Sequence, residues 1–192
     1  MRRLNEVFRP DSGYKAFFLS MATFALAFGL YKGVIDNYLA EVVSMSAFDK
    51  GVSEFFRELP GLLLVFILAV FYYLSAEQLY RVGAVIMLAG MAAQSVVPPT
   101  RVLVILCIFV FSLGDHIQLG MRNTLSLEYA EQGRGGEALG FQNAVYQIGM
   151  LVSGTFSVWA IVAILLLIGF MYLLFRPYKE SQKLEFKMKK SA

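Results

Sequence analysis

The chain has one cysteine, one histidine and few charged residues, and each shortage excludes a class of protein. Only 16% of its 192 residues are charged, whereas soluble domains have about 25%. Cys107 is the single cysteine, so an intramolecular disulfide is excluded. A single histidine excludes a multi-histidine metal site, and no His, Cys and Glu spacing typical of a metal site occurs. We therefore expect no metal or other cofactor.

The rest of the composition is typical of a membrane protein. Hydrophobic residues make up 58% of the chain, and the mean hydropathy is +0.62. Runs of about 18 or more apolar residues are long enough to cross the roughly 30 Å hydrocarbon layer of a bilayer. We therefore predict an all-α integral membrane protein with six transmembrane helices. The predicted spans are residues 16–38, 52–74, 82–97, 102–127, 138–154 and 156–175.

Lysine and arginine are distributed unevenly around these spans. Four lie before the first span, six after the last, and two in the loops after spans two and four, whereas the opposite side has two. Basic residues concentrate on the cytoplasmic side of membrane proteins, so both termini are predicted to be cytoplasmic. We therefore interpret the net charge of +3 as the result of basic residues that orient the chain in the lipid bilayer of a cell membrane. It does not indicate nucleic-acid binding. The predicted domains are a cytoplasmic segment, 1–15, a six-helix bundle, 16–175, and a basic cytoplasmic tail, 176–192.

The fourth predicted span carries ionisable groups near its middle. Ionisable groups in hydrocarbon cost at least ~2.5–3.5 kcal/mol each, so they usually face a bundle interior or a water-filled path. At 100° per residue, nearly all polar side chains of this span share a wedge of about 160°. Asp115 and His116 are the candidates for a proton relay; the alternative is a neutralised pair of Asp115 and Arg122 that only fixes packing. The predicted pathway residues of this span are Asp115, His116, Gln118, Arg122 and Asn123.

The fifth predicted span offers a matching set of hydrogen-bonding side chains. These are Gln142, Asn143, Tyr146 and Gln147. By the same count they lie within about 140° of one another on a helix. Amides and a phenol at this depth suit hydrogen bonding to a polar solute. Structural hydrogen bonds between helices would produce the same pattern, so both interpretations stay open.

A second group of charges is predicted at the outer ends of the first two spans. Antiparallel neighbouring helices place these residues at one depth, where opposite charges can neutralise each other. The predicted outer charge network contains Lys32, Asp36, Asn37, Glu54, Arg57 and Glu58. It is either an interfacial ion network or, in a transporter, an outer gate or part of the substrate site.

Several fragments resemble the amino-terminal half of a major facilitator superfamily transporter. GLYKGVIDNYLAEV (29–42) and GVSEFFRELPGLLL (51–64) are similar to the exit of that family's first span and the entry of its second. SLGDHIQLGMRNTLSL (112–127) and GEALGFQNAVYQIGMLVSG (136–154) are similar to its spans four and five. The resemblance implies a secondary transporter for a small polar solute, possible proton coupling, and no enzymatic activity.

The chain also departs from that family. The signature loop GxLaDrxGrr corresponds to YYLSAEQLYR (72–81), in which Ala76 replaces the acidic residue. His116 and Gly120 match the spacing of R-x-x-x-G in span four without its arginine, and Ser153-Gly154 replaces the Gly-Pro of the antiporter pattern. Members usually have two six-span halves that hold the cargo between them. One half implies that a second copy or a partner chain supplies the other.

Three other interpretations remain. The chain could be the six-span substrate-capture subunit of a vitamin or micronutrient uptake system, docking an ATPase complex through a stripe of small residues, Ala25, Gly29 and Gly33. It could also be a truncated membrane protein that transports nothing. An intramembrane enzyme is disfavoured because the adjacent side chains of Asp115 and His116 diverge by ~100° on a helix.

Overall fold

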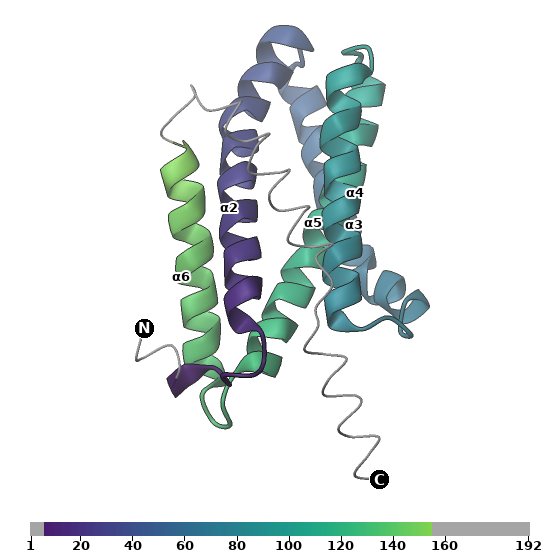
Figure 1. Ribbon diagram of the computed structural model, residues 1–192. Helices are drawn as coiled ribbons and strands as arrows, with labels where there is room; N and C mark the ends of the chain where they lie inside the picture. The colour runs from purple at the N-terminus through teal and green to yellow at the C-terminus, as the bar shows by residue number, and fades with distance from the viewer. Residues whose placement is uncertain (1–5, 155–192) are drawn as a thin grey trace. The chain divides into compact units, whose positions relative to one another are not determined.

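The computed structural model describes residues 6–154, and this part of the chain is helical (Figure 1). No strand occurs within it, apart from a single backbone bridge between Phe8 and Ala130. The predicted sixth span and the basic tail lie outside the described residues. In chain order the elements are α2 (Tyr14–Asn37), the π-helix η1 (Tyr38–Val42), α3 (Ala47–Val70), α4 (Ala76–Val96), α5 (Arg101–Tyr129) and α6 (Gly135–Gly154).

Three of these helical segments are long and apolar enough to cross a membrane. They are Tyr14–Val42, Ala76–Val96 and Arg101–Tyr129. The helix α3 is not among them, and its first half contains Glu54, Arg57 and Glu58. The described helices lie where five of the six spans are predicted. Six spans and the cytoplasmic termini stay a prediction.

Two helices begin earlier than the apolar pattern predicts, because a serine caps each of them. Ser46 accepts a hydrogen bond from the amide of Asp49, and the Asp49 side chain accepts one from the Ser46 amide. Ser75 and Gln78 form the same reciprocal capping box at the start of α4. Such boxes satisfy amides that have no partner within the helix. The loops therefore shrink to residues 43–46 and 71–75.

The C-terminal end of α2 continues into η1 and then turns sharply. The Val43 amide donates to the Tyr38 carbonyl at 3.1 Å, which is the spacing of a π-turn. Ser44 follows with φ of 54°, in the left-handed region. Leu39, Val43 and Met45 are then buried in one cluster with Val104 and Ile108 of α5. The turn replaces the longer external loop expected between residues 40 and 51.

The fold divides into two compact units, which are described separately. Within the described residues, unit 1 contains 6–33 together with 126–154, and unit 2 contains Val34–Leu125. Because α2 and α5 each cross this division, both units share them.

Unit 1 pairs the first part of α2 with α6, and the two helices lie side by side in Figure 1. A Cβ built on Gly29 would lie 1.9 Å from Ser153 Oγ and 2.7 Å from the Met150 carbonyl oxygen. A Cβ on Gly149 would meet Ala25 Cβ at 2.7 Å. Small residues on both helices thus allow close backbone approach. Two residues of the proposed ATPase-docking stripe, Ala25 and Gly29, therefore pack against α6 of the same chain.

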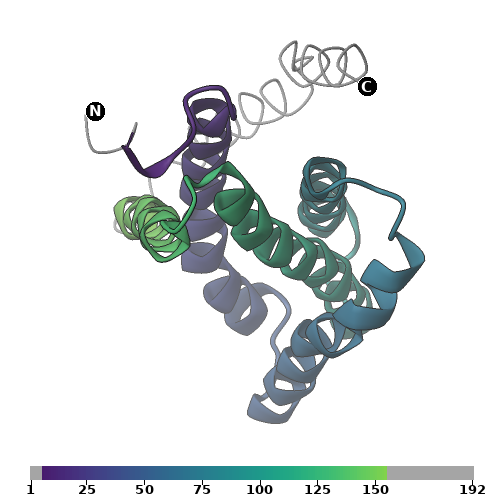
Figure 2. The same cartoon turned by 90° about the horizontal axis from the view of Figure 1, so that it is seen from below.

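The segment before α2 is held on the loop between α5 and α6 (Figure 2). The Arg9 amide donates to the Tyr129 carbonyl at 3.0 Å, and the Glu131 amide donates to the Val7 carbonyl at 2.8 Å. Val7 and Phe8 are buried. The described part of the predicted cytoplasmic segment is thus packed against the bundle.

Unit 2 contains a close contact between α4 and α5. A Cβ on Gly114 would lie 2.4 Å from the Gly83 carbonyl oxygen, and one on Gly90 would lie 2.6 Å from the Phe111 amide nitrogen. The two backbones therefore approach as closely as their glycines allow. Met87 fills the space beside Gly114 and is buried.

Candidate functional site

The polar side of α5 is mostly removed from the surface. Ser112, Gln118 and Ser126 are almost completely buried, and Arg122 is buried as well. Asp115, His116 and Asn123 are partly buried. The amide nitrogen of Gln118 donates to the carbonyl oxygen of Tyr80 on α4 at 3.1 Å. Polar groups without such partners are costly inside a protein, so this bond explains how α5 keeps a buried amide.

His116 lies between a serine on its own helix and a glycine on α3. Its Nδ1 is 2.9 Å from the Ser112 carbonyl oxygen and 3.1 Å from Ser112 Oγ. The Ser112 hydroxyl also donates to the Arg57 carbonyl, which ties α5 to α3. A Cβ on Gly61 would lie 2.7 Å from both Cδ2 and Nε2 of the imidazole. The ring position therefore depends on the absence of a side chain at Gly61.

The other ring nitrogen of His116 faces a carboxylate. Nε2 lies 3.7 Å from Glu58 Oε2. The second oxygen of Glu58 pairs with Arg57 Nη2 at 3.2 Å, and Arg57 also pairs with Glu54 at 2.5 Å. The four side chains form a chain of contacts between α3 and α5, which we call the His116 cluster: Glu54, Arg57, Glu58 and His116.

The His116 cluster joins two sites that the sequence pattern separates. Glu54, Arg57 and Glu58 were predicted in the outer charge network, and His116 was predicted in the pathway of span four. Glu58 is the twelfth of 24 residues in α3, and His116 is the sixteenth of 29 in α5. Both therefore lie near the middle of their helices. The charges of α3 reach the same depth as the ionisable part of α5.

The remaining residues of the outer charge network lie on α2. Asp36 and Asn37 are exposed at its end, and within unit 2 the described ion pairs of α3 do not include them. Lys32 is half-buried and belongs to unit 1. The structure thus brings together three of the six predicted residues.

The predicted residues of span five lie on α6 in unit 1. Gln142 and Tyr146 are buried, whereas Asn143 and Gln147 are exposed. The Tyr146 ring stacks on Phe24, with centroids 6.3 Å apart. Its aromatic contacts show that Tyr146 packs in unit 1. The polar residues of α6 belong to unit 1, whereas the His116 cluster belongs to unit 2.

An ion pair at the start of α3 holds this helix to the start of α5. Arg101 Nη1 lies 3.1 Å from Asp49 Oδ2, and Arg101 also donates to the Ser44 carbonyl at 3.4 Å. Hydrogen bonds from Ser46, together with the Arg101 charge, lower the pKa of the Asp49 carboxyl. The contact between α3 and α5 is therefore polar where the two helices begin as well as at its middle.

Gly61 and the Tyr80 carbonyl are parts of the site that sequence reasoning missed. Nothing in the sequence marks Gly61 as the neighbour of His116, because that proximity depends on the rotation of α3. Among the described residues, no group of three or more His, Cys, Asp or Glu side chains is placed to hold a metal ion.

Searches of protein-family models, curated proteins and solved structures gave no match to this chain. The resemblance to the major facilitator superfamily therefore stays an expectation drawn from the quoted fragments.

Proposed function

We propose that the chain is a half-size, facilitator-like secondary transporter in the cell membrane, which moves a small polar solute, is coupled to protons and pairs with a second half. The observation that carries this proposal is the His116 cluster, a set of ionisable side chains near the middle of two helices. Such groups at membrane depth usually mark a substrate, ion or proton path.

The exposure of the cluster supports the need for a second half. The side chains of Glu54 and Glu58 are 52% and 62% exposed, whereas that of His116 is 19% exposed. Carboxylates exposed at mid-helix would face hydrocarbon if this chain stood alone in a bilayer. A water-filled path or a partner must therefore cover this side of α3. A second copy of the chain is the simplest partner.

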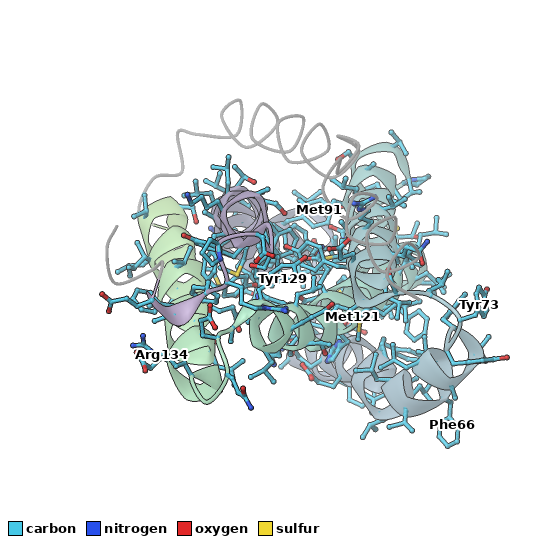
Figure 3. All side chains as sticks on the ribbon, turned by 60° about the horizontal axis from the view of Figure 1, so that its bottom comes forward. Phe66, Tyr73, Met91, Met121, Tyr129 and Arg134 are labelled. Atoms are coloured by element: carbon cyan, nitrogen blue, oxygen red, sulfur yellow. The ribbon has the colours of Figure 1, made fainter. Side chains whose placement is uncertain are left out.

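The rest of α3 supports its place in a membrane. Beyond Pro60 the helix exposes large apolar side chains, and Figure 3 shows Phe66 and the following Tyr73 pointing away from the ribbon. Lipid can cover such a surface without loss of hydrogen bonds. The helix thus has an apolar half suited to lipid and a charged half suited to a polar path.

The alternative as a capture subunit receives less support. Its proposed docking stripe is occupied within unit 1, where Gly29 packs against Ser153 and Ala25 against Gly149. Only Gly33 of that stripe is exposed, with nothing near its Cβ position. A docking surface for an ATPase complex would have to lie elsewhere.

Reconstitution tests the proposal. Proteoliposomes with a trapped pH dye are exposed in turn to sugars, amino acids, carboxylic acids and amines, with protein-free vesicles as the blank. We expect one solute class to change the internal pH only when protein is present. Asp115→Asn keeps the side-chain shape and removes one charge of the path, so it should abolish the response. Glu41→Gln, an exposed change in η1, is the matched control.

The stoichiometry in nanodiscs completes this test. We expect two copies of the chain per particle, since one copy leaves the charges of α3 uncovered. A monomer without a protein-dependent pH response to any solute class would contradict the proposal. A stable complex with an ATPase would favour the capture subunit instead.

A further inference from the structure

The hydrogen bonds of His116 determine which ring nitrogen carries the proton in the neutral form. A carbonyl oxygen only accepts hydrogen bonds, and Nδ1 lies 2.9 Å from the Ser112 carbonyl. Nδ1 therefore carries the hydrogen, and Nε2 is left with a lone pair. Two acceptors, Nε2 and Glu58 Oε2, then face each other at 3.7 Å. A proton placed on Nε2 turns this unfavourable pair into an ion pair.

The charges around His116 point to the same conclusion. Glu54 and Glu58 share one guanidinium, that of Arg57, which lies 2.5 Å from Glu54 and 3.2 Å from Glu58. With neutral His116 the cluster has one uncompensated negative charge. One proton on His116 brings the cluster to neutrality. In a membrane, where water screens charges poorly, a neutral cluster is strongly preferred.

Asp115 and Arg122 are the other charged groups in this part of α5. Asp115 is the adjacent residue of α5, and its side chain leaves the helix at an angle of ~100° from that of His116. The helix α4 packs on α5 at Gly83 and Met87 and carries no charge from Val82 to Val96. The charged groups of α2 and η1 in unit 2, Asp36 and Glu41, are exposed. Glu58 is therefore the group that faces Nε2.

We propose that Glu58 and His116 together bind one exchangeable proton and that this pair is the proton-coupling site of the transporter. The proton is taken from water onto Nε2, where the Glu58 carboxylate stabilises it, and is returned to water on the other side of the membrane. Apart from the exchange of this proton between water and Nε2, no covalent bond forms or breaks. The coupling role rests on the proposed function, whereas the shared proton follows from the contacts of His116 alone.

The protein offers a direct measurement, because His116 is its only histidine. Labelling with ¹⁵N-histidine gives the NMR signals of one imidazole in full-length protein in nanodiscs. We expect the neutral ring to carry its hydrogen on Nδ1 and to exchange with the doubly protonated form as the pH is lowered. A neutral ring with its hydrogen on Nε2 would overturn the proposal.

Two matched variants test the partner. Glu58→Gln removes the carboxylate that faces Nε2 and keeps its size, so the doubly protonated fraction at a fixed pH should fall. Glu54→Gln removes the same charge one turn away, at a carboxylate that contacts Arg57 rather than His116, and its effect should be smaller because the Coulomb energy falls with distance. Equal effects, or none, would overturn the pairing. Both side chains are more than half exposed, so folding should be preserved.

Proton flux in proteoliposomes separates failure of this inference from failure of the proposed function. If a solute drives proton flux and Glu58→Gln leaves it unchanged, transport stands and the coupling role of the pair is overturned. If Glu58→Gln changes the protonation of His116 but no solute drives flux in the native protein, the shared proton stands and transport is overturned. Loss of flux in Glu58→Gln and its retention in Glu41→Gln, the exposed change in η1, would support both.

Discussion

The helix α5 contacts α4 and α3 through two faces that differ in the residues they contain. The contact with α4 is made by backbone and small residues, Gly83, Gly90 and Gly114. The contact with α3 includes one glycine in close contact, Gly61. The other polar contacts there are made by side chains that carry a charge or form a hydrogen bond. The face toward α4 is therefore close and includes one polar contact, from the Gln118 amide to the Tyr80 carbonyl, whereas the face toward α3 is polar and partly exposed.

This difference indicates which helix contacts of unit 2 a change in side-chain charge can alter. Backbone atoms in direct contact cannot move apart without losing packing over the whole crossing, so α4 and α5 form a fixed pair. Side chains such as Glu58 and His116 can change partners by rotation about their own bonds. A change in charge at His116 would therefore act on α3 and leave the pair of α4 and α5 intact.

The largest expected effect is at the close face. Gly114→Ala places a Cβ 2.4 Å from the Gly83 carbonyl oxygen and 2.6 Å from the Met87 amide nitrogen, so backbone must shift. We expect a loss of roughly 1–3 kcal/mol in the free energy of unfolding, or loss of folded protein. Reversible unfolding in detergent mixtures measures it.

Gly120→Ala is the matched control on the same helix, because the nearest atom to its Cβ is Leu64 Cδ2 at 3.9 Å. Alanine also favours helix over glycine by about 1 kcal/mol. The control should therefore be neutral or stabilising. Equal destabilisation by the two changes would show that the close approach at Gly114 has no special role.

An intermediate effect is expected at the polar face. Gly61→Ala brings a Cβ to 2.7 Å from the imidazole of His116, but a side chain can rotate away where backbone cannot. Stability should fall less than in Gly114→Ala, while the histidine NMR signals should change strongly because the ring loses its position beside Glu58. Gly51→Ala, on the same helix with nothing within 4 Å of its Cβ, should change neither. An unaltered histidine spectrum in Gly61→Ala would contradict the packing.

The smallest effect is expected at the start of α3. The pKa of Asp49 is lowered by hydrogen bonds from Ser46, so the carboxylate stabilises the folded state above the ordinary aspartate pKa of about 3.9. This stabilisation is lost as the pH falls through the lowered pKa. Asp49→Asn should therefore weaken the dependence of unfolding on pH below about 4. Glu41→Gln, in the neighbouring turn, should leave it unchanged; an identical pH profile in Asp49→Asn would exclude the cap as its source.

Much of the secondary structure follows from the apolar pattern. Each of the five predicted spans between residues 16 and 154 coincides with a described helix, and α5 and α6 match to within three residues at both ends. The largest errors are at the starts of α3 and α4, and α3 also ends at Val70 rather than at residue 74. At the two starts, Ser46 and Ser75 extend the helices into polar sequence by capping them. Hydropathy does not register such caps, because they depend on hydrogen bonds between single side chains and amides.

The candidate site could be predicted only in part. Helical periodicity predicts that Ser112, Gln118 and Arg122 share one side of α5, and all three are buried. It does not reveal that Glu58 lies opposite His116, since 58 residues separate them in the chain. Their distance depends on how α3 is rotated and how closely Gly61 lets it approach α5.

The sequence by itself determined the helices, their apolar character and the polar side of α5, because these depend on the order of residues along one helix. Only the tertiary structure decided that Ala25 and Gly29 pack against α6, and that Glu58 of the outer charge network contacts His116. The physical reason is the range of the interactions. Periodicity and capping act over one or two turns, whereas an ion pair or a glycine contact joins whichever helices packing brings together.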